Sequence, residues 1–133
     1  MIVADTNLIV YFLVRGQHTE AAEAVYRKDP KWSAPFLWRS EFRKVLILYL
    51  RRKLIGIEES FAIMQQAERL MRGQEFDVES SRVLRLAATS GCAAYDCEFV
   101  ALAQDLGVPL VTSDRALIAR FEPAAVSMRV FGC

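Results

Sequence analysis

Short apolar runs alternate with longer amphipathic segments along this chain. Residues 1–4 and 109–112 are apolar runs that end at polar residues, a pattern typical of strands buried in a parallel sheet. Further strands are predicted at residues 31–34, 75–78 and 126–131. Helical spacing of apolar residues, bounded by capping residues, Gly or Pro, predicts helices at residues 8–14, 19–28, 36–53, 57–71, 79–90, 93–106 and 116–121. Because strands alternate with helices, we expect an α/β domain with a mostly parallel sheet.

The same spacing predicts which face of the longest helix, at residues 36–53, is buried. That face is formed by Leu37, Glu41, Val45 and Leu48. Glu41 is therefore expected to occupy a core-facing position, while Trp38 and Phe42 add aromatic bulk beside the main stripe. An exposed apolar patch on this helix would mark a dimer or partner surface.

Two further helices have an expected buried stripe. In residues 57–71 the stripe is Phe61, Met64, Ala67 and Met71. In residues 93–106, Asp96 falls on an apolar face that includes Phe99 and Ala103. A second acid thus lies within the apolar stripe of a predicted helix.

Size and charge narrow the possible classes. The chain has 133 residues, which favours a single domain over residues 1–133. It is 53% hydrophobic and 25% charged, enough for a real core and unlike a disordered chain. The formal net charge is +1, so any binding of nucleic acid must use a local patch rather than bulk charge.

The three cysteines, Cys92, Cys97 and Cys133, are an odd number without zinc-ligand spacing. We interpret them as free thiols or small apolar residues in a reducing compartment. No apolar stretch approaches the roughly 18 residues that cross a bilayer. A cytoplasmic protein without a membrane partner is therefore expected.

Four acids occupy positions where acids are unusual: Asp5, Glu41, Asp96 and Asp114. Asp5 and Asp114 follow apolar strands, and parallel strands bring such residues to one edge of the sheet. Taken singly, each of these two aspartates is most simply a helix cap, and a lone helical glutamate is usually solvated. The presence of all four acids in such positions favours a cluster of carboxylates. Crowded carboxylates are best neutralised by Mg²⁺ or Mn²⁺. The pattern therefore predicts metal-dependent phosphoryl chemistry, with bound ions activating water.

Several polar residues near these acids are candidates for supporting roles. Asn7 is expected either to hold Asp5 by a hydrogen bond or to serve the turn. Thr112 and Ser113 are expected to orient Asp114 or contact phosphate, with helix capping as the alternative for Ser113. Glu98 is interpreted as a solvated residue at the rim rather than a fifth site acid.

Basic residues surround Glu41 on the same predicted helix. Arg39 and Arg43 form a pair four residues apart, which suits contact with RNA phosphates, an acidic partner or solvent alike. The run at residues 51–53 is best explained as a complement to the helix dipole.

Four segments together resemble one known family: residues 1–7, MIVADTN; residues 37–41, LWRSE; residues 95–103, YDCEFVALA; and residues 109–114, PLVTSD. In this order they are similar to PIN-domain ribonucleases, and within that family to the VapC-type toxins of bacterial toxin–antitoxin pairs. The resemblance covers essentially the whole chain. It implies a three-layer α/β/α sandwich around a parallel sheet of four or five strands.

The resemblance also implies an activity. The family's acidic quartet falls on Asp5, Glu41, Asp96 and Asp114, its Asn on Asn7, and its hydroxyl before the last acid on Thr112. The implied function is Mg²⁺- or Mn²⁺-dependent endonucleolytic cleavage of RNA, by a homodimer that a small antitoxin silences.

Two other functions are compatible with an acidic α/β domain. A PIN-like scaffold that only holds a partner protein is possible, but such a scaffold does not need crowded carboxylates. A phosphate-transfer signalling domain would need a Lys near a late strand, where this chain has Arg115 and no Lys. A metal-dependent ribonuclease is therefore the favoured prediction.

Overall fold

Strand β1 (Ile2–Ala4) lies at the centre of a five-stranded sheet in the computed structural model, which describes residues 1–133. The strand order is β3-β2-β1-β4-β5, and every neighbouring pair is parallel. The other strands are β2 (Trp32–Pro35), β3 (Glu75–Phe76), β4 (Leu110–Val111) and β5 (Ala125–Val126). The predicted α/β class with a parallel sheet is confirmed.

Eight helices connect and cover the strands. They are α1 (Thr6–Leu13), α2 (Thr19–Lys28), α3 (Trp38–Arg51), α4 (Ile57–Leu70), α5 (Ser80–Ser90), α6 (Ala94–Leu106), α7 (Arg115–Phe121) and α8 (Met128–Gly132). None of them is long and apolar enough to cross a membrane.

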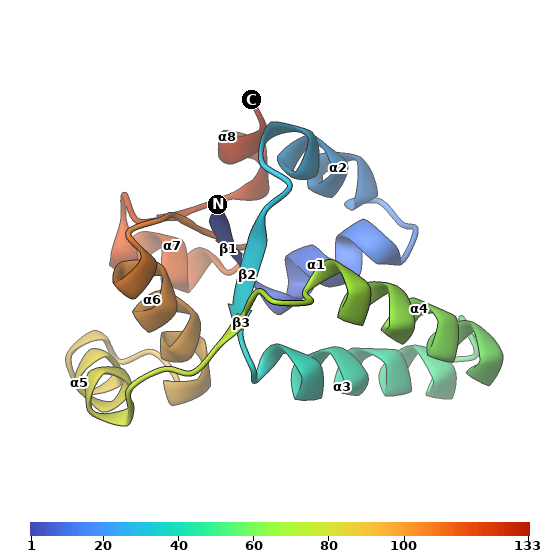
Figure 1. Cartoon of the computed structure of the whole chain (residues 1–133), viewed down its shortest axis with the longest axis horizontal. Coiled ribbons are helices and arrows are strands. Elements are labelled where there is room, and N and C mark those ends of the chain that lie inside the picture. Colours follow the sequence, from blue (N-terminus) through green and yellow to red (C-terminus); the bar gives the residue numbers. More distant parts are fainter.

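The helices form a layer on each side of the sheet. In Figure 1, helices α1 to α4 lie on one side of the strands, and α5, α6 and α7 lie on the other. This arrangement follows from right-handed crossovers, because the chain moves outward from β1 to β3 and then returns past β1 to β4 and β5. The result is the three-layer α/β/α sandwich that the family resemblance implies.

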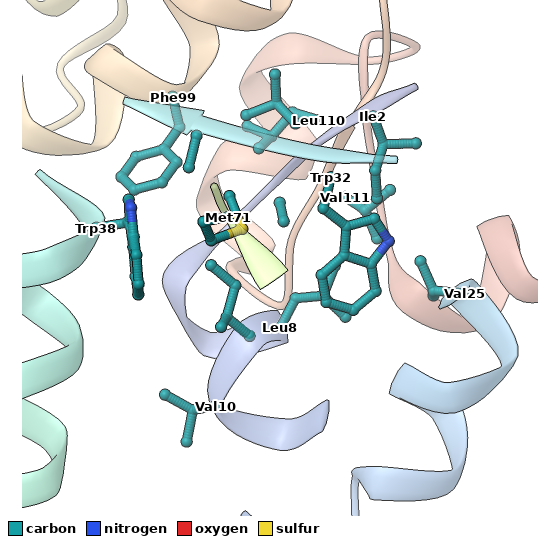
Figure 2. Close-up of a cluster of buried hydrophobic side chains, with 14 of the residues drawn as sticks. Ile2, Leu8, Val10, Val25, Trp32, Trp38, Met71, Phe99, Leu110 and Val111 are labelled. Atoms are coloured by element: carbon teal, nitrogen blue, oxygen red, sulfur yellow. The ribbon is translucent and has the colours of Figure 1, made fainter. Parts of the chain in front are cut away.

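The core is built from the strands and from the helix faces that cover them. Figure 2 shows Ile2, Leu110 and Val111 of the sheet beside Leu8 of α1 and Trp32 of β2. All are among the buried residues of one continuous apolar cluster. Strands β1, β2 and β4 are buried along their whole length, as expected for the centre of a sheet covered on both faces.

The buried face of α3 differs from the predicted one. Its buried residues are Trp38, Phe42 and Leu46, whereas Leu48 is 42% exposed. The two aromatic residues bury more area than the aliphatic stripe, so the helix is rotated to face them inward. The prediction of a core-facing Glu41 is therefore wrong: Glu41 is half-buried at the border between the core and the surface.

Helix α4 shows a similar departure. It buries Ser60, Ile63 and Ala67, with Met71 just beyond its end, while the predicted stripe residue Phe61 is 54% exposed. Ser60 tolerates burial because its hydroxyl donates to the carbonyl oxygen of Ile57 at 2.6 Å.

The predicted strand at residues 126–131 is also wrong. Strand β5 ends at Val126, and the chain then turns into the short helix α8. Ser127 explains the change, because its Oγ accepts a hydrogen bond from the Val130 amide at 3.1 Å and so caps the helix. The three cysteines are free thiols, as predicted.

Candidate active site

Strands β1 and β4 bring two of the predicted site acids to one edge of the sheet. The strands pair in parallel with Val3 opposite Leu110 and Ala4 opposite Val111, as the sequence predicts for strands that end in acids. Asp5 follows β1 directly, and its amide donates to the Val111 carbonyl oxygen at 3.1 Å. The strand order reverses between β1 and β4, and sheets of this kind bind ligands at such a point.

Both strand-end aspartates also cap helices. Asp5 Oδ1 accepts from the Asn7 amide at 3.1 Å at the start of α1. Asp114 Oδ1 accepts from the amides of Ala116 at 2.9 Å and Leu117 at 3.2 Å at the start of α7. These hydrogen bonds fix both side chains while engaging only one oxygen of each carboxylate for the cap. Capping and a functional role are therefore compatible at both positions.

A single hydroxyl connects the two aspartates. Thr112 is fully buried, and its Oγ1 donates a hydrogen bond to Oδ2 of Asp5. The same oxygen accepts from the backbone amide of Asp114 at 3.0 Å. The sequence analysis expected Thr112 to orient Asp114, and the structure shows in addition a direct contact with Asp5.

Glu41 and Asp96 reach this edge from helices. Glu41 lies in the first turn of α3 and Asp96 in the first turn of α6, and both are half-buried. Glu41 Oε1 accepts a hydrogen bond from Oγ1 of Thr6 at 2.7 Å. Sequence reasoning missed Thr6, although a threonine directly after a strand-end acid is well placed to face the same site.

All four acids line one cleft of about 590 Å³. Asp5 and Asp114 lie at the edge of the sheet, and Asp96 lies in α6. Glu41 lies in the first turn of α3, which forms one wall of the cleft. Volumes between roughly 300 and 1,000 Å³ are typical of ligand-binding pockets. The cleft therefore has room for a small ligand beside the four acids, and α3 extends away from them.

Burial and mutual repulsion raise the pKa values of three of these acids. For Asp5 the largest cause is burial, which the hydrogen bonds from Thr112 and the Asn7 amide oppose and the charge of Asp114 reinforces. Burial also raises the pKa of Glu41, against the Thr6 hydrogen bond, and the charges of Asp5 and Asp96 add to it. For Asp96 burial again leads, followed by the charges of Asp114 and Asp5. The charge of Asp114 thus acts on Asp5 and Asp96, and the charges of Asp5 and Asp96 act on Glu41, so these side chains lie close enough to repel one another.

The donor set suits a hard divalent cation. Carboxylate and hydroxyl oxygens are the ligands that Mg²⁺ prefers, and the cluster lacks a cationic side chain to neutralise it. No three His, Cys, Asp or Glu side chains of the structure are arranged as a ready-made metal cage. Mg²⁺ does not require one, because it keeps several waters and typically takes one or two protein carboxylates. The residues present therefore fit such an ion in an open site.

The remaining candidate residues divide between the cleft and its surroundings. Asn7 lines the cleft, but its contact with Asp5 is made by the backbone amide rather than the side chain. Ser113 is half-exposed, and Asp114, not Ser113, caps α7. Glu98 is half-buried in a separate hollow beside α5, and burial raises its pKa. Glu98 is thus only partly solvated, and its charge also raises the pKa of Glu41.

The two arginines considered for RNA or partner contact also separate. Arg43 lines the cleft. Arg39 turns toward β3, where its Nε and Nη2 donate to the Glu75 carboxylate at 2.6 and 2.7 Å. Arg39 also reaches Glu68 at 3.3 Å. Its charge is thus neutralised within the fold, away from the acids.

Comparison with known proteins agrees with this geometry. Residues 2–122 match the model of the PIN domain. The chain belongs to the PIN domain family. No protein of curated function matches the chain in sequence.

Two solved structures share the PIN fold of this chain. PAE2754 from Pyrobaculum aerophilum is 20% identical, with a TM-score of 0.76 over 98% of this chain and 85% of that one. FitAcB from Neisseria gonorrhoeae is also 20% identical, with a TM-score of 0.72 over 96% of this chain and 98% of that one.

Proposed function

We propose that this PIN-domain protein is a metal-dependent endoribonuclease that hydrolyses RNA phosphodiesters. The observation that carries the proposal is the convergence of four carboxylates on one cleft at the switch point of the sheet. Three of them have pKa values raised by burial and by one another. A fold has no structural need for such mutual repulsion, so a bound cation is its natural explanation.

The roles of the residues follow from their positions. Asp5, Glu41, Asp96 and Asp114 would hold one or two Mg²⁺ or Mn²⁺ ions. Such an ion supplies an activated water nucleophile and neutralises charge that builds on the phosphodiester. Thr112 orients Asp5, and Thr6 orients Glu41, through the hydrogen bonds described above.

The biological setting we propose is that of a toxin in a toxin–antitoxin pair. The motifs that resemble VapC-type toxins support this, as does membership of the PIN domain family. A protein partner and a homodimer both need exposed apolar surface, and the tip of the α3–α4 hairpin exposes Leu54, Ile57 and Phe61 by 52–65%. These residues are the first candidates for contact with an antitoxin or a second copy.

A non-catalytic PIN-like binding module is the second candidate. It is favoured by a groove of about 740 Å³ beside the α1–α2 connection, lined in part by Tyr11, Tyr49 and Leu54. A protein that only held a partner there would not depend on the four acids.

The deciding experiment is cleavage of total cellular RNA by the purified protein with Mg²⁺, with Mn²⁺ and with EDTA. Asp5→Asn and Asp96→Asn remove the charge of two site acids, and Asp77→Asn is the matched control because Asp77 is exposed outside the cleft. We expect discrete, EDTA-sensitive fragments with wild type and Asp77→Asn only. Absence of cleavage by antitoxin-free protein that binds the metal would reject the nuclease in favour of the binding module.

A further inference from the structure

Two of the three cysteines lie on either side of the site acid Asp96. Cys92 lies in the connection between α5 and α6, and Cys97 lies in α6 directly after Asp96. Because Ala93 is the N-cap of α6, Cys92 is the residue before the cap and Cys97 is the fourth residue of the helix. Side chains at these two positions commonly pack against each other where a chain enters a helix. The two thiols are therefore expected to be neighbours, although they are five positions apart in the sequence.

The structure brings both cysteines to the same hydroxyl oxygen. Oγ of Ser90 accepts a hydrogen bond from the Cys92 amide at 3.1 Å and lies 3.9 Å from Sγ of Cys97. Cys92 also packs against the small apolar cluster that Cys97 forms with Val83 and Ala101 between α5 and α6. Burial raises the pKa of Cys97, and charge on Cys92 adds to this rise. The two side chains thus share one pocket.

The two thiols differ in their access to solvent. Cys97 is fully buried, whereas Cys92 is half-buried at the surface of the same pocket. A small oxidant in solution therefore reaches Cys92 and is kept away from Cys97. An accessible cysteine beside a second cysteine that can resolve its oxidised form is typical of reversible oxidation sites. In a reducing compartment, disulfides of this kind are usually transient and serve redox sensing or catalysis.

We propose that Cys92 and Cys97 are a reversible oxidation site, which a peroxide converts into a disulfide across the start of α6. The Cys92 thiolate attacks hydrogen peroxide, so an S–O bond forms, the O–O bond breaks and hydroxide leaves. The sulfur of Cys97 then attacks the sulfur of this sulfenic acid and gives up its proton. The S–S bond forms, the S–O bond breaks and water leaves. Overall, two thiols lose two electrons and two protons, and the peroxide becomes two waters. Exchange with a free thiol reverses the step.

The disulfide acts on the acid that lies between its two ends. Asp96 reaches the cleft from the first turn of α6, and the packing of Cys97 against α5 holds that turn in place. A disulfide instead fixes its two Cβ atoms about 3.5–4.5 Å apart with a defined dihedral angle. Oxidation therefore replaces the packing that positions Asp96 and weakens the binding of a cation in the cleft. This consequence rests on the proposed function, whereas formation of the disulfide does not.

The first test detects the disulfide without reference to the nuclease. The background is Cys133→Ser, because Cys133 is exposed and would form disulfides between molecules. The reduced, folded protein is treated with equimolar hydrogen peroxide, and remaining thiols are blocked with N-ethylmaleimide in denaturant before trypsin digestion. Both cysteines fall in the tryptic peptide of residues 86–115. We expect this peptide to lose two hydrogens and carry no maleimide, with circular dichroism unchanged. The same peptide with two maleimides would overturn the inference.

The second test assigns the roles of the two cysteines. In Cys97→Ala, which keeps a small apolar side chain in the buried pocket, the sulfenic acid of Cys92 has no thiol to resolve it. We expect dimedone, which traps sulfenic acids, to label Cys92 in this variant and to label it far less when Cys97 is present. Cys92→Ser is the matched control, and it should give neither label nor disulfide because its remaining thiol is buried. Equal labelling of Cys92 with and without Cys97 would overturn the inference.

The third test measures the effect on the cleft by the rise in melting temperature that Mg²⁺ causes. We expect a smaller rise in the oxidised protein than in the reduced protein, and full recovery with dithiothreitol, which does not repair oxidised methionine. The double variant of Cys92→Ser and Cys97→Ala should not respond to peroxide.

These outcomes separate the oxidation site from the proposed function. A disulfide that forms without changing the response to Mg²⁺ would refute the effect on the cleft. A reduced protein that does not respond to Mg²⁺ would count against the proposed metal site and its regulation. In that case the mass of the peptide of residues 86–115 still decides whether the oxidation site exists.

Discussion

The hydroxyl of Thr112 donates a hydrogen bond to Oδ2 of Asp5 across 107 positions of sequence. Its oxygen also accepts from the amide of Asp114. One buried side chain thus sets the positions of the two aspartates that follow β1 and β4. This hydrogen bond also opposes the rise in the pKa of Asp5 that burial causes. Thr112 therefore favours the ionised form of Asp5 and holds its carboxylate at the cleft.

Thr112→Val should weaken the proposed metal site while preserving the fold. Valine matches the shape of threonine but lacks the hydroxyl, so Asp5 loses its donor. Removing such a supporting hydrogen bond typically costs about 10- to 100-fold in metal affinity or activity. We expect the Mg²⁺ concentration for half-maximal RNA cleavage to rise by that factor. Thr112→Ser, which keeps the hydroxyl, should remain close to wild type; equal loss in both variants would point to packing instead.

Thr6→Val tests the corresponding contact at Glu41. Thr6 is 4% exposed and donates to Glu41 Oε1 at 2.7 Å, a hydrogen bond to a charged group. Such bonds contribute roughly 1.5–3 kcal/mol, and less here because Glu41 is partly solvated. In a double-mutant cycle with Glu41→Ala, which removes the acceptor, urea unfolding in EDTA should give a coupling energy of about 1 kcal/mol. Additive effects would show that the contact contributes nothing.

The sequence predicted the acidic edge because its signals are local. Each apolar run ends at an acid. Parallel pairing of β1 with β4 then brings Asp5 and Asp114 together, independently of how the helices pack. The interaction of Thr6 with Glu41 was not predictable in this way. It depends on how α1 packs against α3, and a contact between two helices has no periodic signature in one sequence.

The face of α3 was mispredicted because two apolar stripes compete on that helix. Leu37, Val45 and Leu48 form one stripe, and Trp38, Phe42 and Leu46 form another, one residue further along. Periodicity alone does not show which stripe is buried. The larger aromatic side chains of the second stripe bury more area, so that stripe faces the core. The rotation leaves Leu48 exposed in the cleft and Glu41 at the border between the core and the cleft, as its proposed role as a metal ligand requires.

Glu75→Gln should destabilise the junction between β3 and α3. The Glu75 carboxylate accepts from Arg39 at 2.6 and 2.7 Å and from Trp38 Nε1 at 2.8 Å, and the hydrogen bond from Arg39 lowers its pKa. We expect a loss of about 1–2 kcal/mol in urea unfolding at neutral pH, discounted because Arg39 is 37% exposed.

A matched control exists in the same network. Glu68 forms one ion pair, with Arg39 at 3.3 Å, and its side chain is 38% exposed. Glu68→Gln should therefore change the free energy of unfolding by less than about 0.5 kcal/mol. Because the pKa of Glu75 is lowered in the folded protein, its contribution is present above the ordinary carboxyl pKa. It should disappear as the pH falls through the folded value, so wild type and Glu75→Gln should converge in acid.

Asp96→Asn should stabilise the metal-free protein. Burial and the charges of Asp114 and Asp5 raise the pKa of Asp96 above its ordinary 3.8. The folded state therefore binds this proton more tightly than the unfolded state, and the free energy of unfolding falls as the pH rises between the two pKa values. Asparagine avoids that loss. In EDTA at neutral pH we expect the variant to melt at a higher temperature than wild type, with the difference vanishing below the ordinary carboxyl pKa of 3.8.

We expect metal to reverse the order of the melting temperatures of wild type and Asp96→Asn. This reversal would distinguish a metal-binding cluster from one that is merely crowded. A ligand that binds only the folded state stabilises it in proportion to the logarithm of its concentration over Kd. Wild type should therefore gain melting temperature steadily with Mg²⁺, while Asp96→Asn, which lacks one carboxylate, should gain much less. Asp77→Asn is exposed outside the cleft and should follow wild type in both conditions. If Mg²⁺ raised the melting temperature of Asp96→Asn as much as that of wild type, Asp96 would not be a metal ligand, and its raised pKa would reflect only burial and the charges of Asp114 and Asp5.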